Sequence, residues 1–346
     1  MFSEPTFPLI ALPLGFVSTV LLTYLLIKVG LRKGLVDIPN ERSSHMSPVP
    51  RGGGLAIVIS FFVFLLVHPG IVEAPIDMSI WKGLLLGSAI VAAVGLIDDL
   101  NHIPARWRFL THSFAAVLSL SLLTSLPEIP LFGSSFDLGM FGYLAFAISL
   151  VWFVNLFNFM DGIDGIAGVE AITVLGGAAL IMFLQGLGDW LTLFGYLAAC
   201  IAGFLVWNWP PAKVFMGDAC SGFLGFTLGM LAIITSTSGV MNIWSWLILF
   251  GVFVIDATTT LITRLIRREK WYKAHRSHAY QILSRRFGSH WKVSVGVLII
   301  NIAWLLPLGF LASVYPYWGL PICCVALLPL LILAYRVGAG KQEALV

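Results

Sequence analysis

Two carboxylates stand among three glycines in the stretch NFMDGIDGIAG, residues 158–168, with apolar sequence on both sides. Asp161 and Asp164 are spaced i, i+3, so they share a face if that turn is helical. Glycine lets a backbone approach a ligand closely. The pattern indicates a turn that brings acidic side chains next to a ligand, at the boundary of an apolar segment.

Three more aspartates lie at similar boundaries. Asp98 and Asp99 close the apolar run in GLIDDLNHIPARWR, and Asp218 precedes another run in NWPPAKVFMGDACSG. Adjacent carboxylates at a helix C-terminus repel each other and oppose the helix dipole, so a basic side chain or a metal ion should compensate for them. Carboxylate oxygens favour a hard cation, Mg²⁺ with Mn²⁺ as a substitute, and no His/Cys cluster favours zinc.

Simpler roles remain open for some of these acids. Asp164 or Asp218 could N-cap the helix that follows it. Asp256 lies inside an apolar run. An ionisable residue there is a functional-site candidate, or it hydrogen-bonds to a neighbouring helix.

Two polar segments could contact phosphate. SSHMSPVPRGGG, residues 43–54, places Arg51 ahead of three glycines, and such a loop cradles a phosphate or forms only a turn. In HRSHAYQ, His275 and His278 share a face if the segment is helical, with Arg276 beside them. The alternative for this second segment is a basic surface that lies on anionic lipid.

The composition explains why these acids stand out. The chain has 346 residues, 59% hydrophobic and 11% charged, whereas a soluble domain carries about 25% charged residues. These values indicate a polytopic membrane protein. A net charge of +3 gives no argument for a nucleic-acid partner. The four cysteines show no CxxC spacing, so we expect reduced, apolar side chains.

The elements that must position the acids are membrane-spanning helices, because backbone groups in lipid must be satisfied internally. We therefore expect an all-α fold of about eleven transmembrane helices in a single domain, residues 1–346. The apolar runs are 8–29, 54–69, 80–97, 109–126, 140–157, 167–185, 189–208, 222–238, 243–263, 293–312 and 319–335. The second and eighth runs are short, so ten spans remain an alternative.

The basic residues predict the orientation. With eleven spans, 19 of the 20 lysines and arginines fall on one face, and Lys82 alone falls on the other. The basic face should be cytoplasmic, which places the N-terminus in the periplasm and the C-terminus in the cytoplasm. All five aspartates at the run boundaries fall on this basic face. Acids that hold a metal ion, beside cations that bind phosphate oxygens, suit a Mg²⁺–diphosphate substrate.

Together, GLIDDL, NLFNFMDGIDGIAG, VFMGDACSG, HRSHAYQ and HMSPVPRGGG resemble the motifs of the polyprenyl-phosphate N-acetylhexosamine-1-phosphate transferases. The resemblance covers nearly the whole chain. It implies a multi-pass enzyme of the bacterial inner membrane, with its active site at the cytoplasmic face. Such an enzyme transfers a sugar 1-phosphate from a UDP-N-acetylhexosamine to undecaprenyl phosphate, with Mg²⁺, and releases UMP. A homodimer is also the family's suggestion.

The resemblance assigns roles by motif. Asp98 and Asp99 match the paired aspartates of the carrier-phosphate and metal region, Phe215 matches an aromatic that stacks on uracil, and Asn208 matches a uridine contact. The expected catalytic residues are Asp98, Asp99, Asp161, Asp164, His275 and His278. The expected substrate-binding residues are Arg51, Asn158, Asn208, Phe215 and Arg276, and the expected metal ligands are Asp99 and Asp218.

One departure from the family pattern bears on the substrate. The muramoyl-pentapeptide transferases have three consecutive histidines where this chain has HRSH. This favours the branch that initiates O-antigen or related cell-envelope glycans. GlcNAc, FucNAc, QuiNAc and GalNAc all remain open as the sugar.

Two other classes compete with a transferase. A secondary transporter also has many spans and a few intramembrane acids, but its coupling acids lie near the midplane, often in repeated halves. Here five acids lie at one edge, no halves match, and Asp256 alone fits the transporter pattern. A non-catalytic membrane scaffold has no need for DD, DGIDG and MGD on one face.

Overall fold

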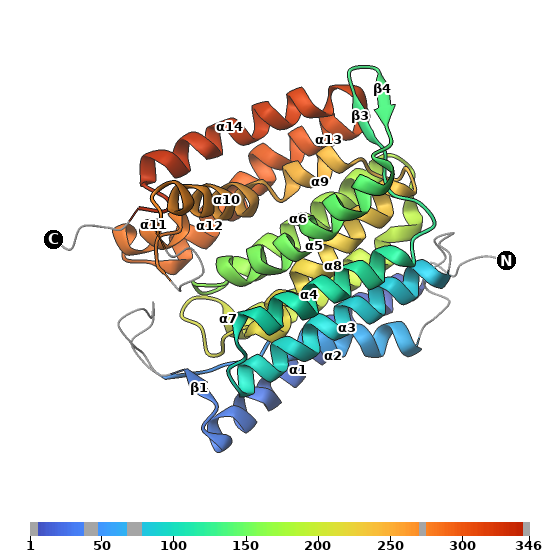
Figure 1. Ribbon diagram of the computed structural model, residues 1–346. Coiled ribbons are helices and arrows are strands. Elements are labelled where there is room, and N and C mark those ends of the chain that lie inside the picture. The colour runs from blue at the N-terminus through green and yellow to red at the C-terminus, as the bar shows by residue number, and fades with distance from the viewer. Residues whose placement is uncertain (1–5, 38–47, 68–77, 270–274, 342–346) are drawn as a thin grey trace.

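Helices account for nearly all the regular structure of the computed structural model, which describes residues 6–37, 48–67, 78–269 and 275–341 (Figure 1). The helices are α1 (Thr6–Lys33), α2 (Leu55–Val67), α3 (Met78–Leu100), α4 (Ala105–Ser121), α5 (Gly139–Met160), α6 (Ile166–Leu184), α7 (Leu191–Asn208), α8 (Asp218–Thr237), α9 (Ile243–Leu249), α10 (Gly251–Ile266), α11 (Ala279–Phe287), α12 (His290–Ile300), α13 (Leu306–Val314) and α14 (Gly319–Val337).

The remaining elements are short. Two 3₁₀ turns, η1 (Gly188–Trp190) and η3 (Pro316–Trp318), precede α7 and α14, and a π-helix, η2 (Asn301–Leu305), joins α12 to α13. Strand β1 (Val36–Asp37) pairs antiparallel with β2 (Val49–Pro50), and β3 (Ile129–Leu131) pairs antiparallel with β4 (Ser134–Phe136). The all-α membrane class is therefore confirmed.

The predicted number of spans is not confirmed. Each predicted apolar run overlaps a helix over most of its described length, but in the described ranges eight helical segments are long and apolar enough to cross a membrane alone. A ninth span exists if α9 and α10, which are bent by 78° to each other, count as one. Helices α2 and α4 have 13 and 17 residues, fewer than the roughly 20 that a perpendicular crossing needs.

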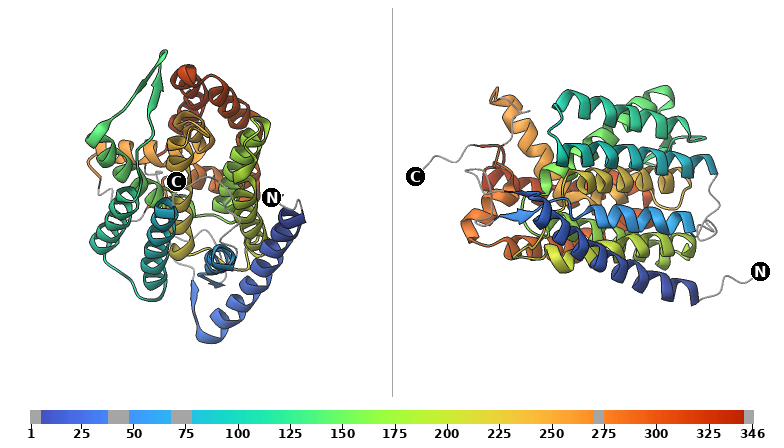
Figure 2. Two further views of the ribbon diagram at one scale, coloured as in Figure 1. Left: turned by 90° about the vertical axis from the view of Figure 1, so that its right-hand side faces the viewer. Right: turned by 90° about the horizontal axis from the view of Figure 1, so that it is seen from below.

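Burial follows the position of each helix in the bundle. Seen along the bundle, α8 lies near the middle and α1 lies at the edge (Figure 2). Of an 18-residue apolar stretch in each helix, 94% of the residues are buried in α8 and 22% are buried in α1. Large apolar side chains such as Leu21, Leu144 and Leu328 are exposed on the outer helices. An apolar exterior around a filled core is the arrangement that a lipid environment requires.

The run boundaries predicted to carry the acids meet at one end of the bundle. The C-terminal ends of α3, α5, α7 and α10 lie there with the N-terminal ends of α4, α6, α8 and α12, on the left of Figure 1. Helix α1 begins at the opposite end from the end of α14. The helices thus bring together aspartates that are more than a hundred residues apart in the sequence.

The opposite placement of the two terminal helices predicts opposite exposure of the chain ends. A tag after Val346 should be cytoplasmic and a tag before Met1 periplasmic, because nearly all the basic residues that the structure describes lie at the end of the bundle where α14 stops. Protease protection in oriented vesicles measures both. Cleavage of both tags from the same side would contradict this orientation.

Candidate active site

Asp99 caps the N-terminus of α8 rather than projecting freely from α3. Its Oδ1 accepts a hydrogen bond from the backbone N–H of Asp218 (3.0 Å), and its Oδ2 accepts one from that of Ala219 (3.1 Å). A carboxylate at a helix N-terminus is stabilised by free N–H groups and by the helix dipole, by about 0.5–2 kcal/mol. The expected compensation for this acid comes from the positive end of another helix.

Asp98 is compensated by a basic side chain, Arg108, which the site prediction did not include. Arg108 Nη1 donates to Asp98 Oδ2 and also to Asp218 Oδ2, at 3.1 Å. The backbone N–H of Ile103 donates to the other oxygen of Asp98 at 2.7 Å. Arg108 stands shortly after the DD pair, at the start of the next apolar run, so its place in the sequence was the available signal.

Asp218 is the point where four helices converge. Asn158, near the end of α5, donates from Nδ2 to Asp218 Oδ1 at 2.7 Å and lies 3.3 Å from Ser221 Oγ. With Asp99 from α3 and Arg108 from α4, this bond places α3, α4, α5 and α8 around one carboxylate. Asp218 is the first residue of α8, and its own side chain does not cap that helix, so the simple N-cap alternative is wrong.

Asp161 completes the group, and no side-chain hydrogen bond of its carboxyl is seen among the described residues, whereas its backbone N–H donates to the carbonyl of Phe157 at 3.1 Å. It follows the last residue of α5. Burial raises the pKa of the Asp161 carboxyl well above its usual range, and the negative charges of Asp218, Asp99 and Asp164 raise it further. The four carboxylates therefore leave an excess of negative charge beside Asp161, which a bound cation would neutralise.

The donor set suits a magnesium ion that is completed by substrate. In the described ranges, no group of three or more His, Cys, Asp or Glu side chains is arranged to hold a metal ion. Mg²⁺ usually takes one or two protein carboxylates, together with waters and substrate phosphates. Asp161 and Asp218 fit that role. Asp99 stays a predicted ligand, although both its oxygens already accept backbone hydrogen bonds.

Asp164 has a different role from Asp161. Its Oδ2 accepts from the backbone N–H of Ala212 (3.1 Å) and lies 3.1 Å from His290 Nδ1, while its carbonyl accepts from Ser294 Oγ (2.9 Å). The residue that N-caps α6 is Gly165, so the capping alternative for Asp164 is wrong too. Asp164 instead joins the turn to α12. His290 is a contact that the sequence did not indicate.

The glycines of the turn have a structural reason. Gly165 has φ = +77°, a left-handed conformation that side chains disfavour. A Cβ atom on Gly162 would lie 2.1 Å from the hydroxyl of Tyr280. The close approach that we expected for a ligand is thus made by α11.

Asn208 and Phe215 belong to the loops that frame the cluster. Asn208 Oδ1 accepts from Gly165 N–H (3.0 Å), and its Nδ2 donates to the carbonyl of Val214 (2.9 Å), so its amide is used within the protein. The backbone of Phe215 bonds to Pro50 and Gly53. The expected uridine contacts of Asn208 and Phe215 stay predictions.

Arg51 lies beside the carboxylate cluster, as a phosphate-binding side chain would. Its Nη2 donates to the backbone carbonyl of Asp99 at 2.5 Å. The loop that carries it is held against residues 215 and 216 by backbone hydrogen bonds. Residues 43–47 of the predicted phosphate loop lie outside the described residues.

The histidine segment is built on Asp256. Asp256 accepts hydrogen bonds from the backbone N–H groups of Ala279 (2.9 Å) and Tyr280 (2.8 Å), and His278 Nδ1 lies 3.3 Å from its Oδ1. Asp256 therefore holds the N-terminus of α11. This arrangement confirms the buried hydrogen bond and explains an acid inside α10.

His275 stacks on His278, with ring centroids 5.0 Å apart. Burial, together with the neighbouring His278 and Arg264, lowers the pKa of His275 to about 3. His275 is therefore neutral at physiological pH and could bind a phosphate oxygen only as a hydrogen-bond donor. Arg276 between them is exposed.

Tyr280 connects the two groups of residues. Its hydroxyl donates to the carbonyl of Phe159 at 2.8 Å, two residues before Asp161. Burial and the charges of Asp256 and Asp161 raise the pKa of Tyr280, so its hydroxyl stays protonated. Among the described contacts, neither His275 nor His278 hydrogen-bonds to the carboxylate cluster, and their catalytic roles stay predictions.

A small cavity of about 70 Å³ opens beside Asp218 between α3, α4, α5 and α8. Its polar lining includes Arg108, His112 and Asn158. The Nδ1 atom of His112 is buried and has no hydrogen-bond partner among the described residues. This volume has room for about two water molecules or one small anionic group.

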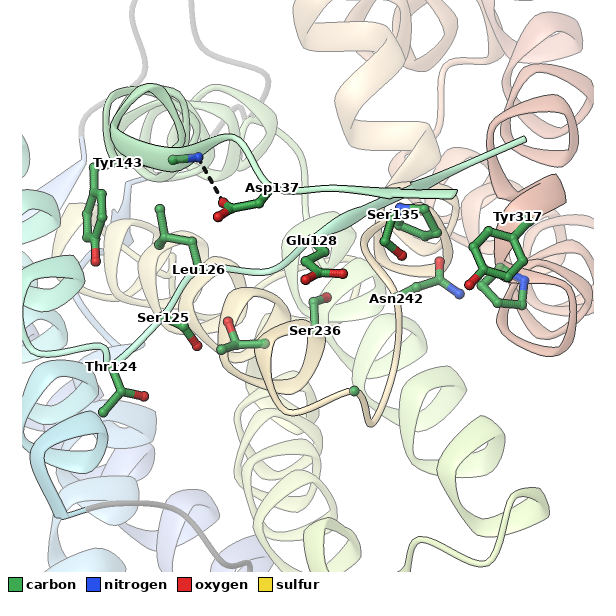
Figure 3. Close-up of a pocket in the computed structure, with 15 residues that line it drawn as sticks. Thr124, Ser125, Leu126, Glu128, Ser135, Asp137, Tyr143, Ser236, Asn242 and Tyr317 are labelled. Atoms are coloured by element: carbon green, nitrogen blue, oxygen red, sulfur yellow. Dashed lines mark hydrogen bonds between the residues drawn. The ribbon is translucent and has the colours of Figure 1, made fainter. Parts of the chain in front are cut away.

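A larger cavity, about 620 Å³, lies at the other end of the bundle and contains none of the predicted site residues (Figure 3). Ser236, near the end of α8, lines it, and α8 is about 30 Å long, so it is remote from Asp218. The charged side chains in its lining are Glu128 and Asp137, with no lysine or arginine. It would repel a diphosphate, so volume is a poor guide to the site here.

The helices that carry the aspartates match a family of known sequences. Residues 81–236 match the sequence model of glycosyl transferase family 4 and span α3 to α8, which contain Asp98, Asp99, Asp161, Asp164 and Asp218. These residues therefore match the model of that family, and the resemblance of the chain to polyprenyl-phosphate N-acetylhexosamine-1-phosphate transferases is confirmed.

Three relatives illustrate this similarity. A probable undecaprenyl-phosphate N-acetylglucosaminyl 1-phosphate transferase of Bacillus subtilis (strain 168) is 27% identical over 88% of this chain and 83% of its own. An undecaprenyl-phosphate alpha-N-acetylglucosaminyl 1-phosphate transferase of Thermotoga maritima is 26% identical over 84% and 87%. A phospho-N-acetylmuramoyl-pentapeptide-transferase of Streptococcus pyogenes serotype M5 is 28% identical over 69% and 73%.

Because folding raises the pKa of Asp161, replacing this acid by a neutral residue should stabilise the protein and abolish its function. An acid whose pKa is raised by folding destabilises the folded state as pH rises from its unfolded pKa toward its folded one. Asp161→Asn should therefore raise the melting temperature in EDTA at about pH 8, by about 2 °C or more, and abolish turnover. Added Mg²⁺ should stabilise the wild-type protein but not the variant. A variant that melts lower than wild type in EDTA would contradict the charge excess.

The buried His278–Asp256 contact predicts a large effect of His278→Ala on turnover. The rate should fall by about a hundredfold or more, which is about 2.7 kcal/mol in the barrier, while membrane association stays unchanged. A lipid-anchoring segment would instead lose association and little rate. Lys292→Ala is the matched control, because Lys292 is exposed at the same end of the bundle. His290 is unsuitable as a control because it contacts Asp164. Equal, near-wild-type rates in both variants would contradict the prediction.

Proposed function

We propose that this protein transfers N-acetylhexosamine 1-phosphate from a UDP-sugar to undecaprenyl phosphate, with Mg²⁺, and releases UMP. The observation that carries the proposal is the convergence of four aspartates with Arg108 at one end of the bundle, namely Asp98, Asp99, Asp161 and Asp218. The negative charge of these acids exceeds the positive charge of the groups that compensate them, and the fold alone does not require this excess. A metal-bound diphosphate donor supplies the missing positive charge and uses the available cations.

The chemistry follows from the charges of the reactants. An oxygen of the acceptor phosphate forms a bond to the sugar-linked phosphorus, and the bond from that phosphorus to the UMP oxygen breaks. The anomeric C–O bond stays intact, so the anomeric configuration is kept. A bound Mg²⁺ would supply charge neutralisation and polarise a phosphoryl oxygen.

The residues of the chain bind and orient the reactants. Asp161 and Asp218 would hold the cation, and Asn158 fixes Asp218 at 2.7 Å. Arg108 and Arg51 lie where phosphate oxygens need cations. A phosphate monoester has a second pKa near 6 and is largely ionised at neutral pH, so Asp98 is not required as a base.

The cavity between α4 and α5 is suited to the acceptor phosphate. It joins Arg108, His112 and Asp218, and its rim includes Phe109 and Phe159, which are exposed apolar side chains on the lipid-facing surface. A carrier lipid could therefore keep its chain in the bilayer while its phosphate reaches Asp218. A water-soluble acceptor would gain nothing from this apolar rim.

The chain's own sequence favours the glycan-initiating branch. HRSH replaces a run of three histidines, and two of the relatives above are named as N-acetylglucosaminyl 1-phosphate transferases. We propose initiation of O-antigen or a related envelope glycan with GlcNAc or another N-acetylhexosamine. The protein would act as a multi-pass, homodimeric enzyme of the bacterial inner membrane, with a periplasmic N-terminus.

The test is an assay of the purified protein with undecaprenyl phosphate, Mg²⁺ and a panel of UDP-N-acetylhexosamines. UMP release and a lipid-diphosphate sugar are expected, with reversible loss of activity in EDTA. Asp218→Asn should abolish turnover and remain folded, because its side chain is polar and close to solvent. Glu128→Gln, at the other end of the bundle, should leave the rate unchanged. Full activity in EDTA, or UDP-sugar flux across vesicles without UMP release, would contradict the proposal.

A further inference from the structure

A sixth acid lies deeper than the cluster, inside α6. Glu170 is completely buried, and so is its partner Asn301, which is 4% exposed and begins the π-helix η2. Asn301 Nδ2 donates to Glu170 Oε2 at 2.7 Å and to Thr173 Oγ1 at 2.7 Å. An ionisable residue within a membrane span calls for a physical account, and the transfer reaction described above does not use Glu170.

Two atoms of this contact are left without partners. Glu170 Oε1 and Asn301 Oδ1 are both buried and make no hydrogen bond of normal length among the described residues, although the backbone N–H of Phe253, in the first turn of α10, approaches the Glu170 carboxyl. Both are acceptors when the acid is ionised, and buried acceptors are normally satisfied. Both hydrogens of Asn301 Nδ2 are already used, by Glu170 and Thr173. A single proton on the carboxyl would satisfy both orphan atoms.

We propose that Glu170 is a neutral carboxylic acid that forms a double hydrogen bond with Asn301. Its Oε2 accepts from Nδ2, and its Oε1–H donates to Asn301 Oδ1. In the described part of the chain, no lysine, arginine or histidine pairs with Glu170, so no cation compensates an ionised form. A carboxylate within the apolar bundle would be costly without such a partner.

The Glu170–Asn301 pair has a position that matters for the proposed transfer reaction. This part of the inference rests on that proposed function. Glu170 lies on α6, which begins at the Asp161–Gly165 turn, and Asn301 follows α12. One face of α12 also carries His290 and Ser294, which both bond to Asp164. Polar contacts therefore join α6 and its turn to the α12 span at two levels.

Glu170 thus acts as a positioning residue. The π-helix at Asn301 changes the register of the span by one residue, and such bulges are stable where a specific contact holds them. By holding the bulge, Glu170 fixes the rotation of α12 and hence the contact between His290 and Asp164. The alternative is an ionisable acid that exchanges a proton or a cation, as a transporter would require.

Infrared spectroscopy tests the protonation state directly. The difference spectrum between wild-type protein and Glu170→Gln should contain the carbonyl stretch of a protonated carboxylic acid, and this band should persist at about pH 8. Recording both spectra with Mg²⁺ keeps Asp161 in the same state in both samples. A carboxylate band in that difference would overturn the proposal, whatever reaction the protein catalyses.

Variants test the positioning role. Glu170→Gln retains a donor and an acceptor toward Asn301, so its kcat should stay within about threefold of wild type. Glu170→Ala loses both, and kcat should fall by about tenfold or more, with the KM for the UDP-sugar less affected. If Glu170→Gln is as impaired as Glu170→Ala, the carboxyl has another role and the proposal fails. If Glu170→Ala retains wild-type kcat, the positioning role is wrong.

The proposed function and this inference fail separately. Absence of transferase activity in the wild-type protein would contradict the function and leave the spectroscopic result to stand by itself. Should Glu170→Ala not fold, Asn301→Asp replaces it as a test. It keeps the size of the side chain but removes the Nδ2 donor to both Glu170 and Thr173, and its kcat should fall as predicted for Glu170→Ala. A wild-type kcat in that variant would overturn the positioning role.

Discussion

Negative charge that must be held at one end of an apolar bundle is the constraint on which the rest of the structure depends. Asp99 is compensated by the N-terminus of α8, and Asp98 is compensated by Arg108. Each solution uses a group from a different helix, so the charges themselves determine which helix ends must meet. The remaining excess at Asp161 is the part that the protein leaves to a ligand.

Much of the architecture follows from hydropathy and charge placement. Apart from closed barrels, helices are the only structures that can span a lipid bilayer. The count of eleven spans is less secure, since α2 and α4 are shorter than a full crossing and α9 and α10 are bent at Phe250. Bends and short helices depend on packing between helices. Packing is a tertiary property that a hydropathy window does not contain.

The sequence predicts which acidic residues form the site, but it does not predict which side chains those residues contact. The motifs indicate Asp98, Asp161 and Asp218, and these residues do converge. The partners Arg108 and His290 are not singled out by the motifs, because a basic residue at a helix end is ordinary, and the signal for Arg108 is its place shortly after the DD pair. Even the glycines of the DGIDG turn have another reason than expected, since Tyr280 occupies the space beside Gly162.

Two buried acids show how the same residue type takes opposite roles in this bundle. Asp256 satisfies the free N–H groups of α11, so its charge has donors and needs no cation. Glu170 accepts a hydrogen bond from the Asn301 amide through one oxygen, and a proton on its other oxygen would let it donate to the amide oxygen of the same residue. The neighbours of an acid therefore decide whether it is held as an anion or as a neutral acid. Depth in the membrane alone does not identify a transport residue, and the partner atoms around each acid are what separate an enzyme's framework from a coupling site.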